Sequence, residues 1–148
     1  MIVNGSDLLK AKPIYAMFPE KHTAHGVSYG LSEAGYDIRI KQEITLHPFR
    51  RFSLASSMER FQMPDDLVGI VHDKSTHIRR QLLVGNSVVE PGWSGWLTIE
   101  LFYTGWRPLT IPARTGIAQV IFHRLSDRRN YSGKYSNQPD HPVEAILS

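Results

Sequence analysis

The amino-acid sequence predicts an all-β protein, a sandwich or barrel of short antiparallel strands. Apolar residues recur at strand-like spacing in four segments, at residues 37–40, 67–71, 97–101 and 117–122. Turn-forming residues separate the strands, at 63–66, 90–92, 104–108 and 111–112. A single short helix is expected near the start of the chain, where Ser6 can cap residues 7–10.

The chain is expected to form one domain over residues 1–148. Its 148 residues match the commonest domain size, and no repeat, low-complexity tract or linker divides it. From Ser126 to Pro139 the sequence is polar and has almost nothing to bury. Two interpretations of the C-terminal segment, residues 126–148, stay open: a loose tail, or a flap that orders over a bound ligand.

Composition excludes several kinds of site. The chain has no cysteine, which excludes disulfides, thiolate zinc sites and the cysteine-containing zinc deaminase signature. No Walker phosphate loop, dinucleotide fingerprint or Gly-x-Ser-x-Gly motif is present. His22 and His25 could share a metal, but we expect no metal bound by the protein itself. With no signal peptide and no membrane-length apolar run, we expect a cytoplasmic protein without a membrane partner.

The net charge of +3 is mild, but the basic residues are clustered. One group lies at residues 72–80 and another at residues 124–134, and together they could converge on one polyanion. A nucleic acid, an acidic surface or a phosphorylated metabolite would each fit. No motif that combines aromatic and basic residues stands out, so we do not expect nucleic acid as a partner.

Residues 73–80 (DKSTHIRR) form the first candidate site, directly after an apolar strand. Hydroxyl groups and backbone N–H groups donate to phosphate oxygens, while Lys74 and Arg79 would neutralise them. Such runs are also common on solvated surfaces, and that alternative stays open.

Glu100 and Gln119 form the second and third candidates, because each interrupts an apolar strand. Alternation places Glu100 on one face with Thr98 and Phe102. Desolvation would raise the pKa of such a carboxyl toward the range used in acid and base catalysis. An exposed edge position or an arginine ion pair remains possible for Glu100. Gln119 either ties strands together or reads a ligand's polar edge.

Five motifs occur in register along the chain. They are residues 34–39 (AGYDIR), 74–79 (KSTHIR), 89–101 (VEPGWSGWLTIEL), 116–119 (GIAQ) and 131–138 (YSGKYSNQ). Together they resemble the dCTP deaminase branch of the trimeric dCTP deaminase and dUTPase family. The resemblance implies a distorted antiparallel β-barrel that forms a homotrimer with shared active sites. It also implies a dCTP substrate whose triphosphate brings Mg²⁺ with it.

The resemblance also implies roles for individual residues. Glu100 would be the proton shuttle, with Ser75 and Arg79 beside the triphosphate and the catalytic water. A C-terminal segment carrying Lys134, Tyr135 and Gln138 would close over the phosphates. The remaining residues expected to bind nucleotide are Lys74, Thr76, Asn86, Val88, Glu90, Gln119 and Tyr131.

Three positions depart from the family pattern, and alternative functions stay open. Lys74 stands where the family more often has Arg, and Gln81 where a glycine is usual. Glu90 replaces the Asp that orders the attacking water in dUTPases. The leading hypothesis is hydrolytic deamination of dCTP to dUTP. The alternatives are a dUTPase or bifunctional enzyme, and a non-catalytic nucleotide-binding or regulatory module.

Overall fold

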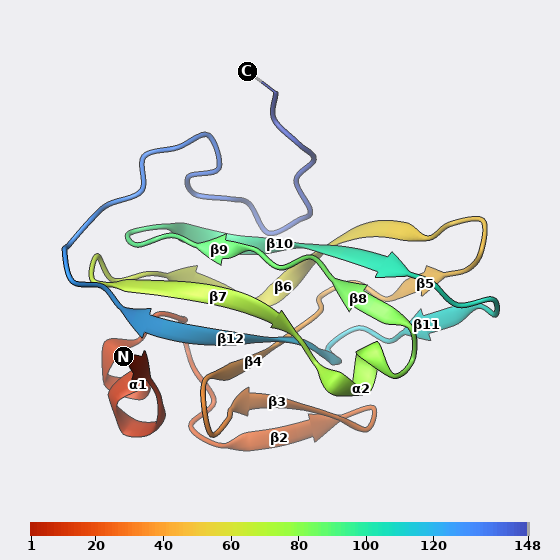
Figure 1. Ribbon diagram of the computed structural model, residues 1–148, viewed down its shortest axis with the longest axis horizontal. Coiled ribbons are helices and arrows are strands. Elements are labelled where there is room, and N and C mark those ends of the chain that lie inside the picture. The colour runs from red at the N-terminus through yellow and green to blue at the C-terminus, as the bar shows by residue number, and fades with distance from the viewer. Residues whose placement is uncertain (148) are drawn as a thin grey trace.

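The computed structural model describes residues 1–147, which form twelve strands and two short helices (Figure 1). The helices are α1 (Gly5–Ala11) and α2 (Ser75–Ile78). The strands are β1 (Ile2–Val3), β2 (Lys21–Ala24), β3 (Val27–Leu31), β4 (Tyr36–Arg39), β5 (Ile44–Leu46), β6 (Phe52–Gln62), β7 (Leu67–Asp73), β8 (Leu82–Val84), β9 (Val88–Val89), β10 (Ser94–Tyr103), β11 (Leu109–Ile111) and β12 (Gly116–Arg124).

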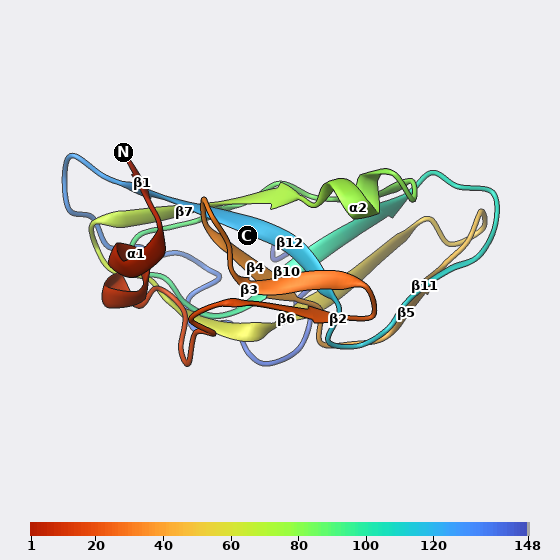
Figure 2. The same cartoon turned by 90° about the horizontal axis from the view of Figure 1, so that it is seen from below.

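The strands pair into three antiparallel sheets. The largest has the order β2-β3-β4-β12-β7-β9, with β1 also paired to β12. The second has the order β6-β10-β8, and the third is the β11-β5 pair at the end of the molecule opposite α1 (Figure 1, Figure 2). The antiparallel all-β prediction is confirmed. Within residues 1–147 the expected distorted barrel consists of three sheets rather than one closed ring of paired strands.

One apolar core joins the two larger sheets. Side chains of the seven-stranded sheet, such as Val71 and Phe122, belong to the same buried cluster as Phe61 of the three-stranded sheet. Strand β10 contributes every second residue, as alternation predicts: Leu97, Ile99, Leu101 and Tyr103 are buried. The opposite face of β10 is therefore free to line a site.

The helices differ from the prediction in two respects. Ser6 does not cap the first helix, because α1 begins at Gly5, two residues before the expected start, and its N-cap is Asn4. The Asn4 amide instead donates to the carbonyl of Glu33 at 2.8 Å. The second difference is α2, which the sequence analysis did not anticipate. Four residues are too few to show helical periodicity in a sequence.

The described part of the C-terminal segment, residues 126–147, packs against the three-stranded sheet (Figure 1). Gln138 is buried and forms a bridge with Gly95, and its carbonyl accepts a hydrogen bond from the N–H of Trp96 at 3.2 Å. The segment is thus held by specific contacts and covers part of β10. No helix within residues 1–147 has the length and apolar character needed to cross a membrane.

Candidate active site

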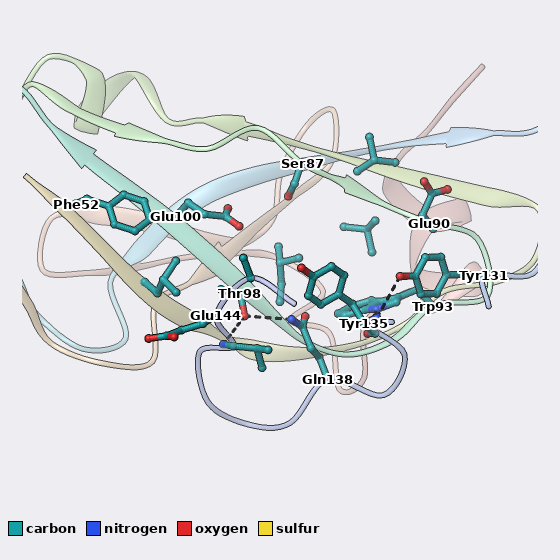
Figure 3. Close-up of a pocket in the computed structure, with 16 residues that line it drawn as sticks. Phe52, Ser87, Glu90, Trp93, Thr98, Glu100, Tyr131, Tyr135, Gln138 and Glu144 are labelled. Atoms are coloured by element: carbon teal, nitrogen blue, oxygen red, sulfur yellow. Dashed lines mark hydrogen bonds between the residues drawn. The ribbon is translucent and has the colours of Figure 1, made fainter. Parts of the chain in front are cut away.

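A pocket of about 580 Å³ lies between the free face of β10 and the C-terminal segment (Figure 3). That volume is typical of small-molecule sites. Its walls come from β10, the start of β6, the β9 region and the C-terminal segment. The lining residues are Phe52, Leu54, Ser87, Val88, Val89, Glu90, Trp93, Leu97, Thr98, Glu100, Tyr131, Tyr135, Gln138, Val143, Glu144 and Ala145.

Glu100 directs its carboxylate into this pocket (Figure 3). Strand alternation places it there, because its neighbours Ile99 and Leu101 turn into the core. Burial raises the pKa of the Glu100 carboxyl above its ordinary value, and only the residue's own backbone opposes the rise. No cation of residues 1–147 offsets this cost. The carboxyl is therefore poised to exchange protons closer to neutral pH than an exposed glutamate is.

Gly85 makes room for this carboxylate. The N–H of Gly85 donates to the Glu100 carbonyl at 2.8 Å, which brings the two backbones side by side. A methyl group at position 85 would lie 3.1 Å from the Glu100 Cβ and 3.2 Å from its Oε2. The carboxylate thus occupies space that any larger residue at position 85 would invade.

The C-terminal segment closes one side of the pocket through hydrogen bonds to β10 and Trp93. The Trp93 Nε1 donates to the Tyr135 carbonyl at 2.7 Å. The Thr98 hydroxyl accepts two hydrogen bonds, from Gln138 Nε2 at 3.3 Å and from the N–H of Val143 at 3.0 Å. Thr98 stands two residues before Glu100 on the same face of β10. The cover is therefore attached next to the carboxylate.

Six of the predicted site residues meet in this pocket. They are Val88, Glu90, Glu100, Tyr131, Tyr135 and Gln138. The remaining seven do not line it within a single chain. Ser75, Thr76 and Arg79 lie together on the exposed side of α2.

The other four predicted residues lie outside the pocket in different ways. Lys74 is largely buried and forms an ion pair with Asp37, and it also donates to the Ser28 hydroxyl at 3.1 Å. Gln119 donates to the Ser32 hydroxyl at 2.8 Å and so ties β12 to the turn before β4. Asn86 is exposed beside the lining residue Ser87. Lys134 donates to the carbonyl of Ile146.

The pocket is acidic, and the basic clusters lie elsewhere. Its lining contains three carboxylates, those of Glu90, Glu100 and Glu144, and no lysine, arginine or histidine. The two basic clusters lie near opposite ends of β7, and so they do not converge within one chain. In the second cluster Arg124 and Arg128 are paired with Asp66 and Asp65. A polyanion in the pocket therefore needs cations from outside this lining.

Several lining residues were missed by the sequence analysis. Phe52 and Leu54 reach the pocket because their strand pairs with β10 in a register that sets Leu54 opposite Glu100. A single sequence carries no signal for that register. Thr98 could have been found, because it shares the face of Glu100. Residues 143–145 gave no signal in the sequence.

Within residues 1–147 no three acidic or histidine side chains cluster as metal ligands would. His22 packs instead against aromatic rings, stacked on Tyr29 at 5.5 Å and edge-on to Phe18 at 5.0 Å. The described residues therefore offer no set of three such ligands for a resident ion.

Comparisons with known proteins identify the family of the chain. Residues 21–125 match the family of dCTP deaminase-like domains. The chain is 33% identical to the dCTP deaminase of Campylobacter jejuni, over 88% of this chain and 88% of the relative. It is 34% identical to the dCTP deaminase of Nautilia profundicola, over 82% and 83% of the two chains.

Solved structures with a similar fold include dUTPases. The EIAV dUTPase superposes with a TM-score of 0.56 at 19% identity, over 70% of this chain and 86% of that chain. A dUTPase of Staphylococcus bacteriophage 80alpha superposes with a TM-score of 0.58 at 14% identity, over 78% and 88% of the two chains. At these identities the likeness concerns the fold alone.

Proposed function

The chain belongs to the dCTP deaminase-like family, and from this premise we propose that it hydrolyses dCTP to dUTP and ammonia, with Glu100 as the proton shuttle. The observation that carries the proposal is the Glu100 carboxylate, partly desolvated in a pocket and without a cationic partner in residues 1–147. A structural carboxylate in such a place would be expected to have a counterion.

The chemistry requires one group that both accepts and returns a proton. Water adds to C4 of cytosine, and Glu100 takes one proton from it as the C4–O bond forms. The same carboxyl then gives that proton to N4, the C4–N4 bond breaks to release ammonia, and the proton of the new C4 hydroxyl moves to N3 to give the keto form of dUTP. Because burial raises the pKa of the Glu100 carboxyl, the free energies of accepting and returning the proton become more nearly equal near neutral pH.

We propose that a homotrimer completes the site, with α2 of a neighbouring subunit bringing Ser75, Thr76 and Arg79 to the triphosphate. Two observations support this. The pocket lining of one chain is acidic. An exposed apolar strip, made of Phe52, Phe102 and Leu83, lies across adjacent strands beside the pocket, with the two phenyl rings 5.1 Å apart. Exposed apolar patches of this kind commonly mark protein interfaces.

The nucleotide would enter as its Mg²⁺ complex, with the ion held by phosphate oxygens and neutralising part of their charge. The C-terminal segment, residues 126–148, would close over this substrate. Tyr131, Tyr135 and Gln138 already line the pocket, and Lys134 would exchange its contact with the Ile146 carbonyl for a phosphate.

A product assay tests the proposed reaction. The purified protein is incubated with Mg²⁺ and, in separate reactions, dCTP, CTP, dUTP or dCMP, and ammonia and pyrophosphate are both measured. We expect ammonia from dCTP without pyrophosphate. Pyrophosphate from dUTP would instead identify a dUTPase or a bifunctional enzyme, and tight binding of dCTP without any product would identify a binding module.

A complementation experiment tests the shared site. Glu100→Gln and Arg79→Ala are each expected to be inactive, because each removes one half of the site. In randomly mixed trimers about one site in four would combine an intact Glu100 with an intact neighbouring Arg79, so activity should return. Confirmed mixed trimers that stay inactive would contradict a site shared in this way.

A further inference from the structure

His77 is the one side chain of α2 that points into the body of the protein. It is fully buried, whereas Ser75, Thr76 and Ile78 on the same helix are exposed. Its position in the basic cluster of the sequence gives no hint of this. The buried imidazole lies on the opposite side of the helix from the proposed phosphate-binding surface of Ser75, Thr76 and Arg79.

One nitrogen of His77 is anchored to a fixed point of the scaffold. Its Nε2 lies 2.7 Å from the carbonyl oxygen of Gly116, at the start of β12. A carbonyl can only accept, so Nε2 carries the hydrogen. Gly116 cannot move away easily, because it is packed against Ser28: a methyl group at position 116 would lie 2.0 Å from the Ser28 carbonyl oxygen. The helix is therefore attached to β12 through this imidazole.

The second nitrogen of His77 has no partner among residues 1–147. Nδ1 is buried and makes no hydrogen bond to the described residues. In the neutral ring it is an unpaired acceptor, which costs less than a buried charge would. A proton there would have no acceptor and would place a buried positive charge near Lys74 and Arg80, opposed by the hydrogen bond to the Gly116 carbonyl and by the Asp73 carboxylate. The Asp73 Oδ1 already accepts from the N–H of Val84 at 2.5 Å.

The geometry points to His77 as a positioning residue that holds α2 against β12 only in its neutral form, so that acidification releases the phosphate-binding surface. This inference rests on the proposed function for the role of α2 in binding dCTP. Burial, reinforced by Arg80 and Lys74, lowers the pKa of His77 below its ordinary value, so the ring is neutral at pH 7. Protonation in acid would disrupt the packing of α2 against β12. We expect it to weaken substrate binding and to leave the rate of the chemical step unchanged.

The central variant is His77→Gln. A glutamine amide can donate to the Gly116 carbonyl as Nε2 does, but it does not titrate. His77→Leu removes the donor as well and leaves that carbonyl without its partner. His72→Gln is the matched control, because His72 is an exposed histidine on the adjoining strand β7.

The steady-state constants for dCTP are measured for each variant from pH 8 to pH 5. A phosphate group of dCTP also titrates in this range, near pH 6, so the informative quantity is the KM of each protein divided by that of His77→Gln at the same pH. We expect this ratio to be near one at pH 8 for the wild type. Below the pKa of His77 it should rise about tenfold for each pH unit.

The other proteins complete the comparison. The His72→Gln control should follow the wild-type ratio, and His77→Leu should show a raised but pH-independent ratio. The kcat of the wild type divided by the kcat of His77→Gln at the same pH should stay nearly constant with pH. A wild-type KM ratio that does not change with pH would overturn the inference, as would a change confined to kcat.

Amide hydrogen exchange without substrate separates this inference from the proposed function. Residues 76–79 should exchange faster in the wild type below the pKa of His77, relative to the intrinsic rate, and His77→Gln should not show this acceleration. The result stands even if dCTP proves not to be the substrate. Equal protection of α2 in both proteins throughout the acid range in which they stay folded would overturn the inference.

Discussion

Glu59 and Glu100 lie on neighbouring strands of one sheet, and burial raises the pKa of both carboxyls. Their surroundings differ. Glu59 accepts two hydrogen bonds from Arg39, at 2.9 Å from the side chain and 2.8 Å from the backbone N–H. Glu100 faces the pocket without a cationic partner in residues 1–147. Burial alone therefore does not mark a candidate catalytic carboxylate; within residues 1–147 the lack of a cationic partner distinguishes Glu100 from Glu59.

The strongest test of this contrast is Glu100→Gln. We expect ammonia release from dCTP to fall by about 10²- to 10⁴-fold or more, because the amide keeps the shape but cannot accept a proton. Binding of dCTP, measured by calorimetry, should be retained. The control is Glu144→Gln, which changes another carboxylate of the same pocket and should keep most of the activity. Substantial turnover in Glu100→Gln would refute its role.

Glu59→Gln should act on stability instead. Removing one partner of a buried ion pair leaves Arg39 uncompensated beside the rings of Phe18 and Tyr29, which typically costs about 3 kcal/mol. Urea unfolding at pH 7 would measure the loss, and the activity of the folded fraction should be unchanged. Glu33→Gln, at an exposed pair with Lys21, serves as the control and should unfold like the wild type.

Truncation after Asn130 should affect Glu100 and leave Glu59 unchanged. Removing the cover exposes the Glu100 carboxyl, so its pKa should fall toward the ordinary value and the acid limb of kcat should move to lower pH. The KM for dCTP should rise several-fold. Thr98→Val is a milder version, since it removes the two hydrogen bonds that hold the cover. An unmoved acid limb in both proteins would show that the segment does not desolvate Glu100.

The smallest expected effect is on folding stability, where Glu100→Gln and Glu59→Gln should change the free energy of unfolding in opposite directions. Because the folded-state pKa of Glu100 is raised, its ionisation destabilises the fold as pH rises from about 4.5 through that pKa. Glu100→Gln should therefore be slightly more stable than the wild type at pH 8, and the difference should vanish near pH 4. Thermal unfolding at both pH values measures it. A variant that is less stable than the wild type at pH 8 would mean that Glu100 has a stabilising partner.

Most of the fold could be predicted because its signals are local. The alternation of residues 97–103 and the turn at 90–92 need no information from distant parts of the chain, and both appear in the structure. Strand β6 was harder to see because Ser56, Ser57 and Glu59 interrupt its apolar residues. These polar groups are buried with partners supplied by distant residues: Gln42 for Ser56, Leu97 for Ser57 and Arg39 for Glu59.

The site could be predicted only in part, because some of its residues depend on partners that are distant in the sequence. Glu100 was found from its own strand, and Gln138 from a motif. The partners of Lys74 and His77 were not, because Asp37 and Gly116 approach them only through the order of strands in the sheet. In the sequence Lys74 and His77 lie in one basic cluster. In the folded protein Lys74 pairs with a carboxylate, whereas His77 is buried.

The close approach of Gly85 to Glu100 limits how this pocket can be redesigned. A library that randomises the lining can vary Val88, Tyr135 or Glu144, since these residues border the cavity. At position 85 even alanine would press on the carboxylate. Attempts to alter substrate preference should therefore leave this glycine unchanged, because a side chain at position 85 would displace the Glu100 carboxylate.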